Sequence, residues 1–298
     1  MSKTSIARQF SKASTHYDNV AIIQRDIAID LVNSLLANIL DKDKIFNILE
    51  LGCGTGFLTY QLLELFKNAN IHATDISSGM IKHMLNNQSK ICNINPFHEN
   101  NPNNQVCYDR IQLEVCDVTQ CEFSKKYDLI VSSSALHWMQ PLSALFYRLG
   151  SACSKGSVFC FALMVDGTFD ELRYIRNNIA PQKPLLWHFP RISEILDSLK
   201  SVGFELSNIK TETKKCCFES VDEFFHTLKT LGVNGRMSHF QCRNVHNSDT
   251  HKSNSHSIIL NRSELKSLAK QYDIFCKKRS NCVFATYEVC IISAYSTK

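Results

Sequence analysis

Residues 48–56 read Ile-Leu-Glu-Leu-Gly-Cys-Gly-Thr-Gly, an apolar run that enters a loop with glycine at every second position. Glycine allows the backbone to turn sharply and a ligand to approach the chain closely. A dinucleotide fingerprint needs Gly-x-Gly-x-x-Gly, but Phe57 stands where the last glycine of that pattern would fall. The loop alone could equally be a structural turn, so its interpretation depends on the residues that accompany it.

Two aspartates follow later strand-like runs at positions that suit a nucleoside. Asp75 ends the run 71–74, about twenty residues beyond the glycines, where an acid that accepts from ribose hydroxyls is expected. Asp117 follows the run 110–115 and can accept from an adenine amino group. Each aspartate alone could cap a helix. Because parallel strands end at the same edge of a sheet, we expect both to lie beside the glycine loop.

Strand-like and helix-like segments alternate along the first half of the chain, which predicts βαβ units and a mainly parallel sheet. Strands are expected at 45–51, 71–74, 110–115, 127–133 and 157–164, and helices at 57–67, 78–90 and 141–153. Further helices are expected at 169–179, 191–201, 221–231 and 261–278, and strands at 204–213 and 283–293 bring the sheet to seven strands.

The residues before the first strand are expected to be helical. Apolar side chains recur every three or four positions over 18–40, the period of an amphipathic helix. Residues 1–17 lack acids and superficially resemble an organellar transit peptide. We favour the alternative, in which Ile6, Phe10 and Tyr17 form one apolar face of a helix that continues into 18–40.

Composition excludes several classes of protein. Hydrophobic residues make up 44% of the 298 residues and charged residues 20%, as in globular domains, and no apolar run is long enough to span a membrane. The net charge of +5 does not by itself call for a nucleic-acid partner. The 13 cysteines are odd in number, contain no Cys-x-x-Cys pair and follow no secretory signal, so we expect reduced thiols in a cytoplasmic protein.

Two stretches are too polar to contribute much to a core and are expected to be flexible surface insertions: 92–109, which is rich in Asn and Pro, and 235–257. The second contains several histidines but no framework of cysteine or acidic ligands, so no metal site is expected. These histidines are His239, His246, His251 and His256.

Together, Glu50, the glycine loop and the two aspartates resemble the class I S-adenosylmethionine-dependent methyltransferases, whose first motif is an acid followed by x-Gly-x-Gly-x-Gly. The resemblance implies an α/β, Rossmann-like fold with a seven-stranded, mostly parallel sheet and helices on both faces. It implies S-adenosylmethionine as cofactor and S-adenosylhomocysteine as product. The cofactor contacts that it implies are Glu50, Gly52, Gly54, Gly56, Asp75, Ile76, Asp117, Val118, Ser132 and Ser133.

Other segments narrow the methyl acceptor by a second resemblance, to the malonyl-[acyl-carrier protein] O-methyltransferases, the BioC family of biotin synthesis. The similar segments are 6–18 with the following Gln24-Arg25, 134–138, 166–172, 228–232 and 260–265. Since they span nearly the whole chain, we expect one methyltransferase domain over 1–298. Its expected parts are a helical cap at 1–40, a cofactor-binding core at 45–165, a lid-like substrate subregion at 166–203 and the C-terminal part of the sheet at 204–298.

This resemblance implies methyl transfer to the free carboxylate of a malonyl thioester on acyl carrier protein or coenzyme A, with no nucleic acid or membrane involved. A carboxylate with a pKa of about 3 to 4 is already ionised near neutral pH, so we look for groups that orient it rather than for a base. The candidates for orienting the carboxylate are Tyr17, His137, Trp138 and Arg148. Alternatively, Tyr17 could only close the pocket, Trp138 could only pack against it, and Arg148 could only snorkel from its helix.

An acidic carrier protein needs a basic docking surface, although a solvated helix face would look the same. The basic residues available for docking are Lys266, Lys270, Lys277, Lys278 and Arg279.

Two alternative functions stay open. The chain could methylate another small carboxylate or a protein, since one fold serves many substrates. It could also be an assembly factor that keeps the fold without methylating.

Overall fold

The computed structural model describes residues 3–39, 41–87, 109–183, 189–233 and 260–297. The predicted insertion at 235–257, with its histidines, and nearly all of the predicted insertion at 92–109 lie outside these ranges. Within the described ranges, no helix is both long and apolar enough to cross a membrane.

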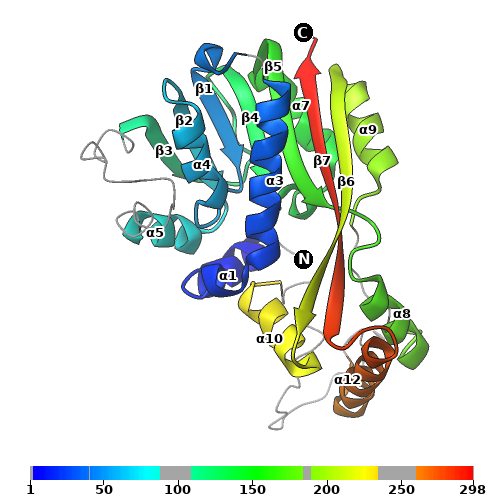
Figure 1. The fold of residues 1–298 in the computed structure, drawn as a ribbon. Coiled ribbons are helices and arrows are strands. Elements are labelled where there is room, and N and C mark those ends of the chain that lie inside the picture. Colours follow the sequence, from blue (N-terminus) through cyan, green and yellow to red (C-terminus); the bar gives the residue numbers. More distant parts are fainter. Residues whose placement is uncertain (1–2, 40, 88–108, 184–188, 234–259, 298) are drawn as a thin grey trace, which may run out of the picture.

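One sheet of seven strands runs through the molecule (Figure 1). Their order across the sheet is β3-β2-β1-β4-β5-β7-β6, and only β7 runs antiparallel to its neighbours. This arrangement confirms the predicted seven-stranded, mostly parallel sheet. The strands are β1 (Asn47–Leu51), β2 (Asn70–Asp75), β3 (Ile111–Val115), β4 (Tyr127–Ser133), β5 (Cys153–Met164), β6 (Phe204–Phe218) and β7 (Val283–Ser296).

Helices cover both faces of the sheet. On one face, α3 (Ile22–Asn38), α4 (Phe57–Leu65) and α5 (Ser78–Asn86) contribute to the larger hydrophobic cluster. On the other face, α7 (Leu142–Ala152) and α9 (Ile192–Ser201) pack into a second cluster. The central strand β1 contributes to both hydrophobic clusters, because successive side chains of a strand point to opposite faces. Ile48 belongs to the first cluster, and Leu49 and Leu51 belong to the second.

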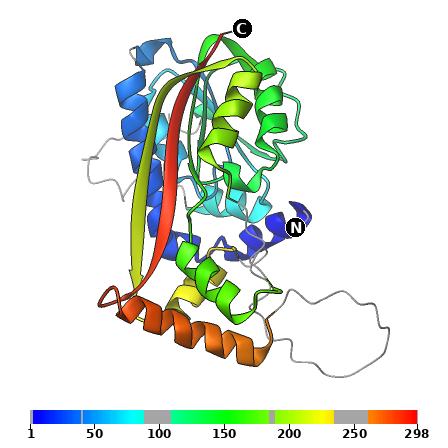
Figure 2. The same ribbon diagram turned by 90° about the vertical axis from the view of Figure 1, so that its right-hand side faces the viewer.

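The ribbon formed by β6 and β7 extends past the rest of the sheet to three helices, α8 (Asp170–Ile179), α10 (Val221–Thr230) and α12 (Arg262–Lys277) (Figures 1 and 2). Both strands run beyond their predicted ends at 213 and 293: they pair from Phe204 opposite Ser296 to Phe218 opposite Val283. The strand β6 lies at the edge of the sheet and leaves many polar side chains in water. The prediction of β6 from alternating apolar residues was therefore too short.

The N-terminal segment forms α1 (Lys3–Ala13) and a single turn, α2 (Tyr17–Val20), before α3 begins. The predicted continuous helix over 18–40 is wrong at Ala21, where a ψ of 45° separates α2 from α3. The Ala21 N–H donates to the Tyr17 carbonyl and closes α2 as its own turn. The helix α1 packs on α5, where a Cβ on Gly79 would lie 2.6 Å from the Ser11 Cα, so glycine permits this contact.

A disulfide links Cys217, near the end of β6, to Cys282, just before β7, with a Cα–Cα distance of 5.8 Å. The expectation of reduced thiols is therefore wrong for this pair. The two residues are 65 positions apart and meet only because β6 and β7 pair, which the sequence does not show. The other cysteines within the described ranges are free thiols.

Candidate active site

The loops that follow β1, β2, β3 and β4 surround a cavity of about 980 Å³ at the carboxyl edge of the sheet. Two predicted cofactor contacts do not line it. Gly56 instead begins α4, and Ser132 donates its hydroxyl to the Leu51 carbonyl at 2.8 Å inside the sheet. The predicted contacts that do line this first cavity are Glu50, Gly52, Gly54, Asp75, Ile76, Asp117, Val118 and Ser133.

The glycine loop turns back on the sheet directly after β1. The N–H groups of Gly52 and Cys53 both donate to the Thr74 carbonyl of β2, at 2.8 and 2.9 Å. Gly52 and Gly54 have φ values of +72° and +57°, the left-handed region that glycine adopts freely. A Cβ on Gly52 would lie 2.4 Å from the Ala135 Cβ, whereas beside Gly54 no atom of the described residues lies within 4 Å. The missing side chain at Gly52 therefore allows the loop to pack against Ala135, whereas the missing side chain at Gly54 leaves open space beside the loop.

Glu50, in β1, lines the first cavity and is only 1% exposed. Burial and the nearby charge of Asp75 raise the pKa of its carboxyl to about 8, and the polar side chain of Thr59 opposes that rise. The Oε2 atom itself has no hydrogen-bond partner among the described residues. Because a buried acceptor without a donor is costly, this atom fits a ligand that brings a hydrogen-bond donor or a positive charge.

Asp75 holds the glycine loop and the start of α5 together. Its Oδ2 accepts from the Gly54 N–H at 2.9 Å, and its Oδ1 accepts from the Ser77 N–H at 2.7 Å. Burial raises the pKa of Asp75 to about 6, and these two hydrogen bonds oppose that rise. Each carboxylate oxygen has two lone pairs, so Asp75 can support the loop and still accept from a ligand in the cavity.

Asp117 is paired with Lys3 of α1, with 2.8 Å between Oδ2 and Nζ. Lys3 also donates to the Thr119 hydroxyl, and Thr119 donates through its N–H and its hydroxyl to Asp117 Oδ1. Burial acts to raise the pKa of Asp117, but the hydrogen bonds from Lys3 and Thr119 outweigh it and lower that pKa. Lys3 lines the cavity as well, and no local sequence pattern linked it to a distant strand end.

A second cavity, of about 560 Å³, adjoins the first. Phe10, Tyr17, Gln24, Ser134 and Trp138 line both cavities, and we call them the border residues. The second cavity is mainly apolar, and no Asp, Glu, Lys or Arg of the described chain lines it. Its remaining lining residues are His137, Met164, Phe169, Phe189, Leu228, Leu231, Val233 and Tyr287.

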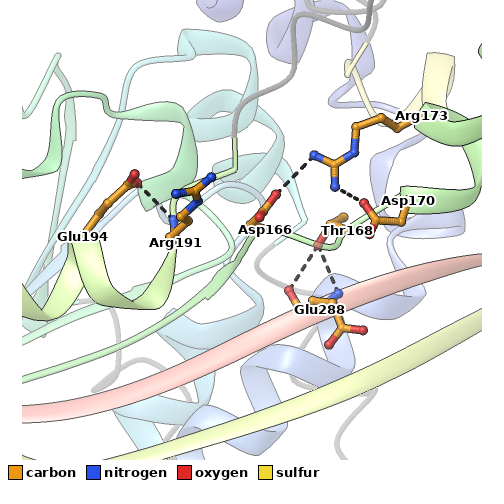
Figure 3. A network of polar contacts seen from close by, with 7 residues as sticks. All are labelled: Asp166, Thr168, Asp170, Arg173, Arg191, Glu194 and Glu288. Atoms are coloured by element: carbon orange, nitrogen blue, oxygen red, sulfur yellow. Dashed lines mark hydrogen bonds and ion pairs between the residues drawn. The ribbon is translucent and has the colours of Figure 1, made fainter. Parts of the chain in front are cut away.

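The turn after β5 holds Phe169 in the wall of the second cavity, with a φ of 59°. Thr168 Oγ1 donates to the Glu288 carbonyl of β7 at 3.1 Å and accepts from the Glu288 N–H at 3.0 Å (Figure 3). Arg173 of α8 pairs with Asp166 at 3.2 Å across the same turn. The segment 166–172, which sequence analysis singled out, thus anchors an aromatic wall to the last strand.

Tyr17 and Trp138, two of the predicted orienting residues, are border residues. The ring of Trp138 meets that of Phe10 edge to face, with centroids 5.4 Å apart. Burial, and after it the charge of Asp75, raises the pKa of Tyr17. The Tyr17 hydroxyl is therefore a neutral hydrogen-bond donor at physiological pH.

The other two predicted orienting residues lie away from the border. His137 is buried and lines only the second cavity, where its ring lies 5.7 Å from that of Phe189. Arg148 lines neither cavity, and its Nη2 donates to the Cys121 carbonyl at 3.2 Å. The structure therefore brings Tyr17, Trp138 and His137 together and leaves Arg148 outside.

Gln24 and Ser134 are border residues that lie in segments singled out by the resemblance but were not among the individual residues predicted for the site. Gln24 lies in the first turn of α3. Ser134 follows β4 and has a φ of 56°, which is uncommon for a residue other than glycine. Three serines stand in a row at 132–134, and nothing in their spacing indicated that the last one faces both cavities.

A carboxylate and two thiols gather beside the first cavity: one atom each of Glu114, Cys116 and Cys121 lie within 4.8 Å of one another. The sequence analysis, which expected no metal site, did not identify this cluster. Burial raises the pKa of the Cys116 thiol, which disfavours the thiolate form that binds metal ions. Cys116 itself lines the first cavity.

Comparison with known proteins relates this site to a family. The family model of a methyltransferase domain matches residues 49–159. Malonyl-[acyl-carrier protein] O-methyltransferase 2 of Ilyobacter polytropus is 30% identical over 240 residues, which cover 79% of this chain and 83% of the relative. This chain belongs to the malonyl-[acyl-carrier protein] O-methyltransferase family. The malonyl-[acyl-carrier protein] O-methyltransferase of Acetivibrio thermocellus is 28% identical, covering 78% of this chain and 79% of its own length.

Solved structures share the fold of this methyltransferase family. The YcgJ protein of Bacillus subtilis matches with a TM-score of 0.55 at 10% identity, covering 90% of this chain and 98% of YcgJ. The [4+2]-cyclase SpnF matches with a TM-score of 0.50 at 11% identity, covering 90% of this chain and 80% of SpnF. These likenesses confirm the Rossmann-like architecture alone, since one fold serves different reactions. Family membership, by contrast, supports S-adenosylmethionine as the cofactor.

Proposed function

We propose that this chain transfers the methyl group of S-adenosylmethionine to the free carboxylate of a malonyl thioester on acyl carrier protein. The observation that carries the proposal is the pair of adjoining cavities, one lined by the acids of the methyltransferase motif and the other apolar. The relatives are named for this acceptor. Methylation would mask the malonyl charge, so that fatty-acid enzymes could elongate the product toward biotin.

The first cavity offers groups that suit each part of the cofactor. We assign Asp75 to the ribose hydroxyls, Asp117 to the adenine amino group and the glycine loop to the methionine portion. The unpaired Oε2 of Glu50 and the open space beside Gly54 support this assignment, because they leave an acceptor and room for a ligand. When bound, S-adenosylmethionine supplies an electrophilic methyl group on a positively charged sulfur.

The protein needs no strong base for this reaction, because the acceptor carboxylate is already ionised near neutral pH. Its residues have to align one carboxylate oxygen with the methyl carbon, and alignment can contribute as much as about 7 to 11 kcal/mol. The oxygen–methyl bond forms while the methyl–sulfur bond breaks and its electron pair stays on sulfur, so both charges disappear. The apolar second cavity favours that loss of charge by excluding water.

Among the predicted orienting residues, we assign Tyr17 and Trp138 to the carboxylate because both have hydrogen-bond donors at the border. His137 lies farther along the acceptor cavity and suits the malonyl thioester beyond its carboxylate. Arg148 lines neither cavity, and we give it no part in the reaction.

A basic face on α12 supports docking of an acidic carrier protein. The side chains that form this α12 basic face are exposed, and α12 lies beside α8 and α10 at the end of the β6/β7 ribbon (Figure 2). Leu228 of α10 lines the second cavity, so the face lies near the acceptor side of the molecule. We place the reaction in the cytoplasm, without a nucleic-acid or membrane partner. The α12 basic face consists of Lys266, Lys270 and Lys277 on α12, with Lys278 and Arg279 directly after its end.

Methyl transfer to defined acceptors tests the proposal. We expect S-adenosylmethionine-dependent methylation of malonyl-acyl carrier protein, detected by mass, and none of acetyl-acyl carrier protein, the matched control without a free carboxylate. Turnover of free small acids or of another protein, but not of the carrier-bound malonyl group, would favour a different acceptor. Binding of the cofactor without turnover of any acceptor would favour a non-methylating assembly factor.

A further inference from the structure

We propose that Ser134 and Gln24 hold the acceptor carboxylate at the border of the two cavities through neutral hydrogen bonds, with no cationic partner among the described residues. This inference rests on the proposed function and deepens it, because it names the groups that distinguish a carboxylate from its methyl ester. Both residues approach the border from different elements, Ser134 from the end of β4 and Gln24 from α3.

Ser134 presents a buried hydroxyl that nothing in the described protein satisfies. Its Oγ is shielded from solvent and has no hydrogen-bond partner among the described residues. Its N–H donates to the Ala162 carbonyl of β5 at 2.9 Å, which fixes the backbone at a φ of 56°. Backbone strain of this kind persists where the surrounding structure imposes it, commonly at functional sites. A hydroxyl that is buried and lacks a partner fits a ligand acceptor.

Gln24 supplies donors to the border from a different element, α3. It lies in the first turn of α3, where Ile23, Ile27 and Ala28 are buried in the hydrophobic core. Its own side chain is only partly buried and lines both cavities. A carboxamide carries two N–H donors, enough to bind one carboxylate oxygen while Ser134 binds the same group from the other side.

The cationic side chains near the border are engaged elsewhere. Lys3 is 2.8 Å from Asp117 in the first cavity. Arg25, next to Gln24 in the chain, lies over the Phe57 ring at 4.9 Å and donates to the Asp18 carbonyl, and it lines neither cavity. Among the described residues, no Lys or Arg lines the second cavity or belongs to the border. A carboxylate at this position would therefore meet neutral donors.

Neutral donors suit a reaction in which the carboxylate loses its charge. A salt bridge would stabilise the charged acceptor more than the transition state, and so would slow the methyl transfer. Hydrogen bonds from Ser134 and Gln24 are stronger to a carboxylate than to an ester. The same pair would therefore bind the acid and release the methyl ester.

The test compares binding of the acid and of the ester. Calorimetry measures how malonyl-pantetheine and its methyl ester bind to the complex of the protein with S-adenosylhomocysteine. We expect the wild-type protein to prefer the acid, and Ser134→Ala and Gln24→Leu each to weaken acid binding about 10- to 100-fold, the range for losing one hydrogen bond to a charged group. Ester binding should change little. The kcat/KM for malonyl-acyl carrier protein should also fall, but by a smaller factor, because these hydrogen bonds weaken as the carboxylate loses its charge.

Further variants separate this role from a structural one. Ser134→Gly removes the hydroxyl and relieves the positive φ, so it should lose acid binding without losing thermal stability. Gln24→Glu keeps the shape but adds a like charge, and should bind the acid less well than Gln24→Leu. The matched controls are Gln61→Leu on α4, where Gln61 donates to the Phe57 carbonyl, and Ser151→Ala on α7; both should keep the wild-type preference.

One result would overturn only the role of Ser134 and Gln24, and another would overturn the proposed function as well. If the wild-type protein methylates the malonyl thioester while the Ser134 and Gln24 variants keep both the preference for the acid and their kcat/KM, the inference is overturned and the proposed function stands. If the wild-type protein neither binds nor methylates a malonyl thioester, both are overturned.

Discussion

Alanine at Gly52 and alanine at Gly54 add the same methyl group to the same loop, yet the structure predicts different consequences. At Gly52 the new Cβ would lie 2.4 Å from the Ala135 Cβ, far inside the usual contact of about 3.5 to 4.0 Å. Overpacking costs about 1 to 3 kcal/mol, and the left-handed φ of +72° adds about 1 to 2 kcal/mol for a residue with a Cβ. We therefore expect Gly52→Ala to lower the free energy of unfolding by about 2 to 5 kcal/mol.

Gly54→Ala should damage cofactor binding instead of packing. Its φ of +57° brings the same strain of about 1 to 2 kcal/mol, but no atom of the described residues lies within 4 Å of the new Cβ. That methyl group would occupy space that we assign to the cofactor. We expect the dissociation constant of S-adenosylhomocysteine to rise by at least about tenfold, or 1.4 kcal/mol. Urea unfolding and calorimetry measure the two effects separately.

The double variant Gly52→Ala/Ala135→Gly serves as the control, because it removes the atom that the new Cβ would strike. It should recover the packing part of the loss, about 1 to 3 kcal/mol, and retain the backbone strain. The reasoning would be refuted if Gly52→Ala were as stable as Gly54→Ala, or if Gly54→Ala bound S-adenosylhomocysteine as tightly as the wild-type protein.

Three further predictions follow from the N-terminus, β1 and α12. Deleting residues 1–17 should abolish turnover, because it removes Tyr17 and the Lys3 contact with Asp117; unchanged activity in a turnover assay would instead support a transit peptide. The pKa of Glu50 is raised from 4.5 to about 8, so the stability that this group contributes is present below pH 4.5 and is lost as the pH rises to about 8. Glu50→Gln should flatten that decline in urea unfolding of the ligand-free protein, and an equally steep decline would contradict the assignment. Reversing charges on the α12 basic face, with Lys266→Glu and Lys270→Glu, should raise the KM for malonyl-acyl carrier protein and leave that for malonyl-coenzyme A unchanged.

The cofactor side of the site could be predicted from the sequence because its parts are local. Glu50, the glycine loop and Asp75 each lie at or just after the end of an apolar run, and a parallel sheet brings such ends to one edge. The sequence also indicated all seven strands, since each shows an apolar run or an apolar alternation over at least part of its length. Predicted strand ends failed mainly at β6, where hydrated side chains on an edge strand hide the alternation.

The border between the cavities could be predicted only in part, through Tyr17 and Trp138. Gln24 and Ser134 of the border, and Lys3 in the first cavity, come from α3, the loop after β4 and α1, and they reach the site through packing that leaves no spacing pattern in the sequence. Arg148 shows the converse: it was a candidate for orienting the substrate carboxylate, but its Nη2 donates to the Cys121 carbonyl, and it lines neither cavity. Residue type and sequence distance do not determine which way a helix faces.

The helix α1 borders both cavities, and its position depends on the residue that we assign to the ribose. Asp75 accepts from the Ser77 N–H at 2.7 Å, and the Ser77 hydroxyl lies 2.9 Å from that of Ser11 on α1. From the same helix, Phe10 reaches both cavities. A cofactor that orders Asp75 should therefore also order α1 and complete the acceptor border.

We expect malonyl-pantetheine to bind more tightly in the presence of S-adenosylhomocysteine. Because linkage is reciprocal, malonyl-pantetheine should tighten the binding of S-adenosylhomocysteine by the same factor. Calorimetry in both orders measures the two factors, and independent binding would show that α1 does not connect the sites.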